Sequence, residues 1–221
     1  MARFIEGSRE GEVNAEVGLV ICNNSPTSGV GVYDKVTDAN QRYGLEIETL
    51  WISSETHPGN PFGRGQTGDE ARAIYEALQE RQIEFVLTLG YMKVINGMLM
   101  KEFGWKAEYA EADPDSQGIY LGRMINTHPG ILPQTKDTHG IGASQRVLDL
   151  GLPQTAHTLH MVAADVDGGP TIAENRVDVV SGMTAAELFD AVQAAEKANL
   201  CGDIDRYFSE RAAYLASHPP V

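Results

Sequence analysis

Residues 70–90 have the sequence EARAIYEALQERQIEFVLTLG, which predicts a helix that runs directly into a strand. In the first half, apolar side chains recur at intervals of three and four residues and so form one face of a helix. These side chains belong to Ala71, Ile74, Ala77 and Leu78. The segment Phe85–Leu89 is then almost entirely apolar, which indicates a strand. A helix followed at once by a strand is typical of an α/β fold.

The same alternation extends along the rest of the chain. We expect strands at 17–22, 45–52, 85–89, 123–126, 157–162 and 171–180, and helices at 2–12, 32–43, 70–81, 143–150, 185–199 and 203–216. The first strand, VGLVIC, is apolar throughout, as is usual for a parallel strand buried on both faces. The pattern therefore predicts an α/β fold with a doubly wound, mostly parallel, Rossmann-like sheet, in a single domain over residues 1–221.

Composition argues against several kinds of partner. The chain has 221 residues and a formal net charge of −14, with scattered basic residues, so its surface should repel nucleic acid. No apolar run of about 18 residues indicates a membrane span. Residues 1–4 open no signal peptide, so we expect a cytoplasmic protein without a membrane partner. Cys22 and Cys201 are expected to be small buried residues that form neither a disulfide nor a zinc site.

A candidate active site begins at Asn126-Thr127-His128-Pro129, where a short apolar strand ends. Ligands of open α/β sheets bind at the carboxyl ends of strands. In an extended segment Asn126 and His128 point the same way, so both could meet one reacting group. The plainer alternative is that Asn126 caps a turn and His128 is an ordinary loop histidine.

A second stretch, Asp165-Val166-Asp167-Gly168-Gly169-Pro170, supplies a carboxylate next to two glycines that let the backbone turn tightly. A carboxylate that faces a histidine and an asparagine is the set that acyl transfer to an amine requires. The amine must lose a proton, the leaving nitrogen must gain one, and the oxyanion needs hydrogen-bond donors.

Asn-x-His-Pro at 126–129 followed by Asp-Gly-Gly-Pro at 167–170 resembles the formyltransferase family, and within it the phosphoribosylglycinamide formyltransferases of purine synthesis. The segment Leu89-Gly90-Tyr91-Met92-Lys93-Val94-Ile95 is similar to the family's folate-pocket segment. The resemblance covers roughly residues 14 to 208, with insertions. It implies transfer of a formyl group from 10-formyltetrahydrofolate to the amine of glycinamide ribonucleotide.

The resemblance also implies roles for individual residues. Asn126 would orient the formyl oxygen and stabilise the oxyanion, and His128 would donate to the oxyanion or shuttle a proton. Asp167 would hold His128 or an ordered water, and its carboxylate should favour the charged form of the histidine. Folate would be bound by Leu89, Met92, Lys93, Val94, Ile95, Ala163, Ala164 and Asp165. The ribonucleotide would be bound by Pro129, Gln193, Glu196 and Arg64.

The chain departs from the family at its start. The resemblance implies that relatives begin with a strand and a Gly-Ser-Asn loop that binds the substrate phosphate. This sequence starts where the next helix would be, so we expect an N-terminally shortened fold. The segment Gly63–Gly68 could take over that task, because it has three glycines, the guanidinium of Arg64 and a following helix. A mobile glycine-rich surface loop is the plainer interpretation.

Other histidines and other functions remain open at this level. His160 matches a family position close to the site and is expected to pack there, and His139 is expected in a loop. His128, His139 and His160 with Asp167 could in principle bind a metal, but no pair of them has the spacing that fixes ligands on one element, so we expect no metal. The alternatives for function are a 10-formyltetrahydrofolate hydrolase, a formyltransferase for another amine, and a non-catalytic folate-binding protein. The sequence is compatible with a homodimer.

Overall fold

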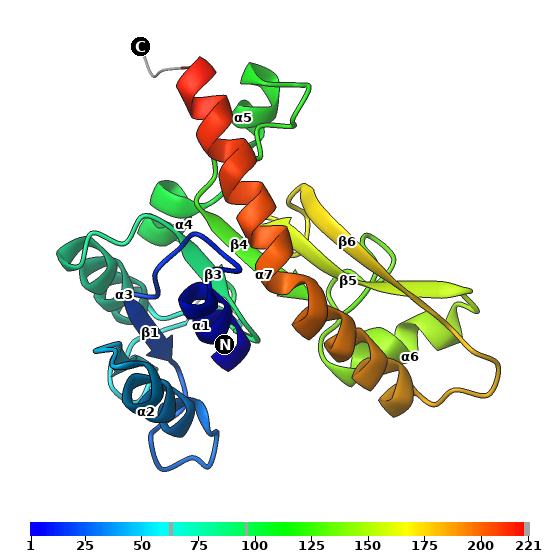
Figure 1. Ribbon diagram of the computed structural model, residues 1–221, viewed down its shortest axis with the longest axis horizontal. Helices are drawn as coiled ribbons and strands as arrows, with labels where there is room; N and C mark the ends of the chain where they lie inside the picture. Colours follow the sequence, from blue (N-terminus) through cyan, green and yellow to red (C-terminus); the bar gives the residue numbers. More distant parts are fainter. Residues whose placement is uncertain (62–63, 96, 219–221) are drawn as a thin grey trace. The chain divides into compact units, whose positions relative to one another are not determined.

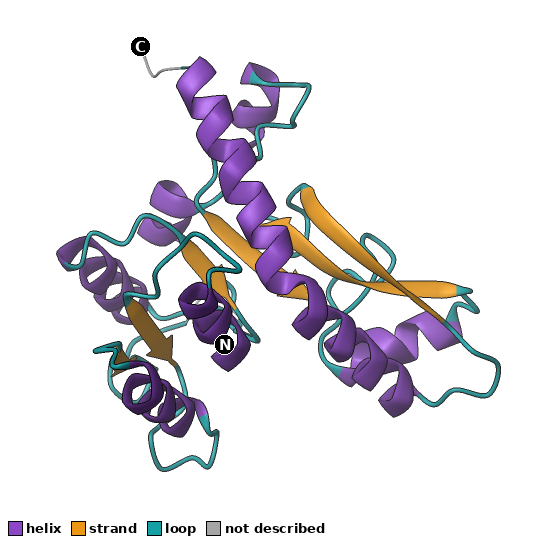
Figure 2. Cartoon of the chain, viewed as in Figure 1, coloured by secondary structure: helices purple, strands orange, loops and turns teal. Residues whose placement is uncertain are grey.

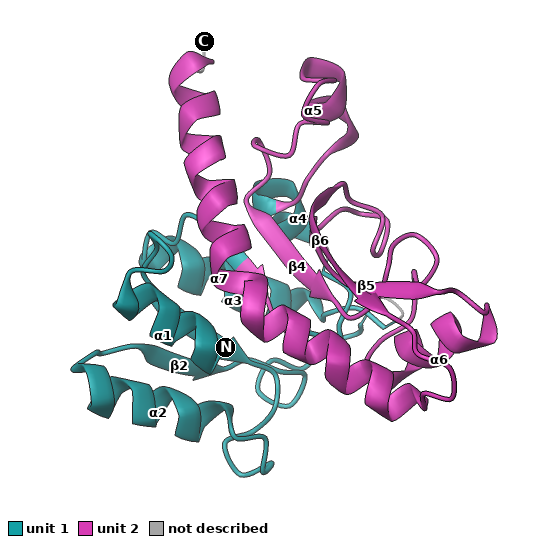
Figure 3. Cartoon of the chain, turned by 45° about the vertical axis from the view of Figure 1, so that its right-hand side comes forward, with its two compact units in different colours: residues 1–86, 90–103 teal, residues 87–89, 104–221 magenta. Residues whose placement is uncertain are grey.

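The computed structural model describes residues 1–61, 64–95 and 97–218, which form a mixed α/β fold (Figures 1 and 2). The chain divides into two compact units (Figure 3). Unit 1 comprises Met1–Val86 and Gly90–Phe103, and unit 2 comprises Leu87–Leu89 and the chain from Gly104 onward. Each unit contains one of the two tryptophans, Trp51 in unit 1 and Trp105 in unit 2.

Unit 1 is built on two parallel strands. Its elements are α1 (Ala2–Glu10), β1 (Leu19–Cys22), α2 (Val32–Tyr43), β2 (Glu48–Trp51), α3 (Gly68–Glu80) and α4 (Gly97–Phe103). Strands β1 and β2 pair in parallel from Leu19 with Glu48 to Cys22 with Trp51. Helices α1 and α2 pack together over a small core of Ile5, Val36, Ala39 and Ile47. Helix α3 buries the face that its periodicity predicts.

Unit 2 is built on a sheet with the strand order β3-β4-β5-β6. Its elements are β3 (Val86–Thr88), α5 (Ala107–Ala112), β4 (Met124–His128), α6 (Ile141–Asp149), β5 (Gln154–Met161), β6 (Thr171–Asp178) and α7 (Ala185–Ser217). The first residue of β3, Val86, is counted with unit 1. Helix α7 lies across strands β5 and β6 and contacts α6 (Figure 1). The buried side chains of the sheet and of α7 form its core: Met124, Ile125, Leu159, Met161, Leu188, Val192, Ile204 and Tyr207.

The α/β class is confirmed, and the structure adds one feature to the expected sheet. Strands β4 and β5 pair antiparallel, as do β5 and β6. The short connection from β5 to β6 explains the antiparallel pairing of these two strands, because a parallel crossover needs a dozen or more residues. The connection from β4 to β5 contains α6 and does not by itself decide the direction of that pair.

Three details of the expected elements were wrong. The helices expected at 185–199 and 203–216 are one continuous helix, α7, because Leu200, Cys201 and Ile204 keep its buried face unbroken across Gly202. Residues 107–112, where no element is expected, form the short helix α5. Strand β4 continues past Asn126 to His128 and ends immediately before Pro129.

Two smaller observations complete the fold. Cys22 and Cys201 are both buried, as expected. Among the residues described, no helix combines the length and the apolar character that a membrane span requires.

Candidate active site

The candidate site lies at the end of β4, within unit 2. Asn126 and His128 are two residues apart on this strand, so both side chains lie on the same face of the sheet. The antiparallel register sets Asn126 opposite His160, and His128 opposite Thr158, on β5. Opposed residues of an antiparallel pair share a face, so the register brings His160 beside the predicted residues.

The amide of Asn126 is fixed from both sides. Its Oδ1 accepts a hydrogen bond of 2.6 Å from the hydroxyl of Thr88, and its Nδ2 lies 3.1 Å from Nε2 of His160. Nδ1 of His160 lies 2.9 Å from the carbonyl oxygen of Met161, which can only accept. Neutral His160 therefore carries its proton on Nδ1 and accepts from Asn126 at Nε2. One N–H of the Asn126 amide remains for another acceptor.

The ring of His128 is fixed in the same way. Its Nε2 lies 2.9 Å from the hydroxyl of Thr135, and that hydroxyl donates a bond of 2.7 Å to the carbonyl oxygen of Ile131. The threonine has one hydrogen to give, so it accepts from Nε2–H of His128. This bond leaves Nδ1 of neutral His128 without a proton, and only 3% of the side chain is exposed.

Asp167 faces both imidazoles. Its carboxylate oxygens lie 3.6 Å from Nδ1 of His128 and 3.7 Å from Nε2 of His160. These distances are too long for direct hydrogen bonds but close enough for strong electrostatic interaction. A proton added to either nitrogen would therefore be stabilised by the carboxylate.

The backbone around Asp167 is held in an unusual conformation. Its φ is 51°, in a region that residues other than glycine rarely adopt, and its carboxylate accepts from the backbone N–H of Asp137 at 3.2 Å. A Cβ at Gly169 would clash with the carbonyl oxygen of Met161. The glycine is therefore required for the close approach of this turn to β5.

Asp167 favours the charged form of His128, as expected, but it does not decide the charge of this histidine. Burial lowers its pKa, and this effect exceeds the opposing one of Asp167, which raises the pKa; the neighbouring His160 also lowers it. Burial likewise lowers the pKa of His160. Both imidazoles are therefore neutral at neutral pH, because taking a charged ring out of water costs more than one carboxylate at this distance returns.

A third histidine lies on the other face of β5. His157 is fully buried, and its Nδ1 lies 3.4 Å from Nδ2 of Asn175, which also donates to Asp203 at 2.6 Å. Burial lowers the pKa of His157 to about 4, although Asp203 raises it. His157 is thus neutral at neutral pH.

The other predicted residues are divided between the two units. Asn126, His128 and Asp167 come together in unit 2, which also contains Leu89, Pro129, Ala163, Ala164 and Asp165, together with Gln193 and Glu196 on α7. Unit 1 contains Arg64, Met92, Lys93, Val94 and Ile95. Arg64 is exposed, and Met92 is an exposed apolar side chain. Gly63, the first residue of the expected phosphate loop, lies outside the described residues.

Some of these side chains have partners within their own unit. Oδ2 of Asp165 accepts from the ammonium group of Lys136 at 2.5 Å. Lys93 forms an ion pair with the buried carboxylate of Glu70.

Two residues of the site were missed. Thr88 orients Asn126 and Thr135 fixes the tautomer of His128, but both are threonines without a motif of their own. Thr88 lies in a strand and Thr135 in the turn after β4. In the structure Gly130 lies against Thr135, because a Cβ at this glycine would clash with the hydroxyl of Thr135. That contact depends on the folded turn, so no pattern in the sequence shows it.

Comparison with known proteins identifies the family. Residues 118–203 match the formyl transferase family model. The phosphoribosylglycinamide formyltransferase of Escherichia coli is 32% identical over 84% of this chain and 77% of its own length. The chain belongs to the formyltransferase family.

Longer and solved relatives agree with this assignment. The human trifunctional purine biosynthetic protein adenosine-3 is 28% identical over 87% of this chain, which spans only 16% of that protein. The crystal structure of phosphoribosylglycinamide formyltransferase from Bacillus halodurans superimposes with a TM-score of 0.69 at 23% identity, over 94% of this chain and 88% of the other. This likeness supports the fold of this formyltransferase.

The formyltransferase site has no set of metal ligands in the part of the chain that the structure describes. No three His, Cys, Asp or Glu side chains there are placed to hold a metal ion.

Proposed function

We propose that this chain transfers the formyl group of 10-formyltetrahydrofolate to the amine of glycinamide ribonucleotide. The observation that carries the proposal is the arrangement of Asn126, His128 and Asp167 at the end of β4, which contains a fixed amide donor, a neutral imidazole and a carboxylate. The relationship to phosphoribosylglycinamide formyltransferases supports the choice of donor and acceptor.

The first step is attack of the amine nitrogen on the formyl carbon. A carbon–nitrogen bond forms, the carbonyl electrons move to oxygen, and the nitrogen becomes positively charged. The N–H of Asn126 that is not used by His160 would donate to the oxyanion. Because Thr88 and His160 hold this amide before substrate binds, the donor needs no reorganisation during the reaction.

The second step is proton transfer. The neutral Nδ1 of His128 would accept the proton that the attacking nitrogen loses, and Asp167 would stabilise the imidazolium that results. The same proton then passes to N10 of the folate as the bond from the formyl carbon to N10 breaks. The products are the formylated amine and tetrahydrofolate, and the enzyme returns to its starting state.

The family resemblance assigns residues to each of the two substrates. Folate would be bound by the apolar side chains and backbone of Leu89, Met92, Lys93, Val94 and Ile95, and by the backbone of Ala163, Ala164 and Asp165. The ribonucleotide would contact Pro129, Gln193 and Glu196. These assignments rest on the family resemblance.

Arg64 is proposed to bind the phosphate through its exposed guanidinium. The N-terminus of α3 would add little, because the Thr67–Glu70 capping box uses two of its backbone donors and Asp69 and Glu70 make its first turn acidic.

The decisive experiment follows tetrahydrofolate formation by absorbance, with and without glycinamide ribonucleotide. Turnover that requires the ribonucleotide supports the proposal. Turnover without an acceptor identifies a hydrolase instead, turnover only with another amine identifies a different acceptor, and binding without turnover identifies a folate-binding protein.

A further inference from the structure

Unit 1 contains a carboxylate that the proposed reaction does not use. Glu70, in the first turn of α3, is fully buried. Its Oε2 accepts from the backbone N–H of Thr67 at 2.7 Å, and the hydroxyl of Thr67 accepts in return from the N–H of Glu70 at 3.0 Å. This capping box fixes the start of α3 but uses only one of the two oxygens of Glu70.

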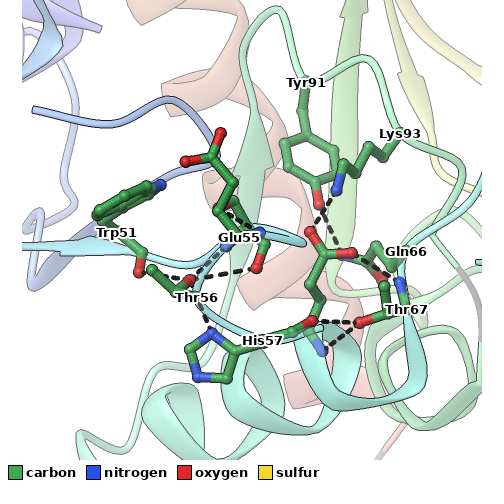
Figure 4. A network of polar contacts seen from close by, with 10 residues as sticks. Trp51, Glu55, Thr56, His57, Gln66, Thr67, Tyr91 and Lys93 are labelled. Carbon is green, nitrogen blue, oxygen red and sulfur yellow. Dashed lines mark hydrogen bonds and ion pairs between the residues drawn. The ribbon is translucent and has the colours of Figure 1, made fainter. Parts of the chain in front are cut away.

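The second oxygen of Glu70 holds Lys93. The ammonium group binds Oε1 of Glu70, and 22% of the lysine side chain is exposed, compared with 1% of the glutamate side chain. Figure 4 shows Lys93 and Tyr91 directed toward Gln66 and Thr67. A charge as deeply buried as that of Glu70 needs a close partner of opposite charge, so the ion pair constrains Lys93 strongly.

Backbone contacts connect the same two segments. The N–H of Gln66 donates to the carbonyl oxygen of Val94 at 3.1 Å, and the N–H of Val94 donates to that of Arg64 at 3.2 Å. The amide of Gln66 donates to the hydroxyl of Tyr91 at 2.9 Å. Burial raises the pKa of Tyr91 to about 12, so this hydroxyl stays neutral. The segment Tyr91–Ile95 is thereby attached at three points to the residues just before α3.

We propose that Glu70 is a positioning residue for folate binding. By holding Lys93, it keeps Tyr91–Ile95 in one backbone conformation, with Met92 presented to the ligand. This inference rests on the proposed function, which assigns the segment to folate. Glu70 itself touches no substrate, and Lys93 acts here as a tether within the protein.

The test is Glu70→Gln, which keeps an oxygen for the N–H of Thr67 and removes the charge that holds Lys93. The freed ammonium can reach water, so the variant should fold. We expect the KM for 10-formyltetrahydrofolate to rise tenfold or more and kcat to stay within about twofold. Amide hydrogen exchange of Gln66 and Val94 should accelerate. The matched control is Glu76→Gln on an exposed position of α3, which should leave all three quantities unchanged.

Two further variants separate a tether from a purely structural group. Lys93→Gln removes the same ion pair from its other side and should raise the KM by about the same factor as Glu70→Gln. In the Glu70→Gln background, Lys93→Gln should raise the KM no more than about twofold further, because the interaction is already lost.

The outcomes are distinct. An unchanged KM in Glu70→Gln overturns the proposal, whether or not exchange accelerates. Equal losses of kcat and kcat/KM with a lowered melting temperature also overturn it. If the wild-type protein turns over 10-formyltetrahydrofolate and Glu70→Gln has the same KM, only the positioning role fails. If wild-type protein neither binds nor turns over 10-formyltetrahydrofolate, the proposed function fails before any variant is compared.

Discussion

His128 owes its chemical character to a single hydroxyl. Thr135 accepts from Nε2 and thereby leaves Nδ1, the nitrogen that faces Asp167, as the basic one. A histidine whose pKa is lowered by burial is a weak base at rest, but a carboxylate at this distance stabilises the proton once it arrives. This combination suits a group that must accept a proton and then return it.

His128→Ala and Asp167→Asn should each lower turnover by about a hundredfold or more, because the proton acceptor and the carboxylate act mainly in the transition state. Folate affinity should stay within a few fold. Steady-state kinetics and direct folate titration of both variants make the measurement. Turnover close to that of the wild type in either variant removes the catalytic assignment of that residue.

The pH dependence of kcat/KM gives a second test. His128 must be neutral to accept a proton, and its pKa lies below the ordinary value of 6.5, so activity should persist below pH 6.5 before it declines. Asp167 raises the pKa of His128, so in Asp167→Asn the remaining activity should decline only at still lower pH. An acid limb that moves to higher pH in this variant would contradict the assignment of the base.

At the residue scale, the sequence was informative where chemistry follows from a motif. Asn126, His128 and Asp167 are recognisable by type and spacing, and the structure brings them together. The protonation state of His128 was not predictable, because it depends on burial by residues distant in sequence. The roles of Thr88 and Thr135 were not predicted for the same reason, because only the folded chain determines which group a buried hydroxyl contacts.

Helix α7 illustrates what a local pattern omits. Two helices are expected at 185–199 and 203–216, and Gly202 lies between them. Glycine in a helix interior costs about 0.5–1 kcal/mol relative to alanine. The helix continues because Leu200, Cys201 and Ile204 are buried in unit 2, and burial of such side chains contributes more than the glycine costs. The elements with clear periodicity, such as α3, were predicted nearly to their ends, whereas the antiparallel pairing of β4, β5 and β6 required knowledge of the connections.

Gly202→Ala should therefore stabilise the protein by about 0.5–1 kcal/mol. Gly202 is exposed, and a Cβ there would meet no other atom within 4 Å. Chemical denaturation gives the free energy of unfolding. Gly169→Ala is the control of opposite sign, because its Cβ would clash with Met161 and should destabilise the turn. A Gly202→Ala variant less stable than wild type would mean that the helix is strained there.

At the scale of the whole molecule, buried histidines couple stability to pH. Burial lowers the pKa values of His128, His157 and His160, that of His157 to about 4, whereas in the unfolded chain each titrates near 6.5. Between these values the unfolded state binds more protons than the folded state. The stability that these neutral histidines contribute is thus fully present above pH 6.5 and is lost as the pH falls toward 4.

The contribution of His157 can be isolated by substitution. Its shift corresponds to about 3 kcal/mol, so the free energy of unfolding of the wild type should fall by at least that amount between pH 7 and pH 4. His157→Gln should show a shallower dependence, because the glutamine does not titrate. Equal slopes for the two proteins would show that His157 is already charged in the folded state.

The α/β fold class of the molecule could be predicted from the sequence, because alternating helices and strands leave few ways to bury a sheet. Its division into two compact units did not, since the chain crosses between them at Val86, Gly90 and Gly104 without a glycine- or proline-rich linker. The single-domain organisation remains a prediction.

The distribution of the two tryptophans makes that organisation accessible to spectroscopy. With Trp51→Phe, indole fluorescence arises from Trp105 alone and reports on unit 2; with Trp105→Phe, it arises from Trp51 and reports on unit 1. Denaturation curves that coincide in the two variants would mean that both units unfold in one cooperative transition. Curves that separate would give each unit its own free energy of unfolding. The fluorescence of the wild type could not resolve these two values, because both tryptophans contribute to it.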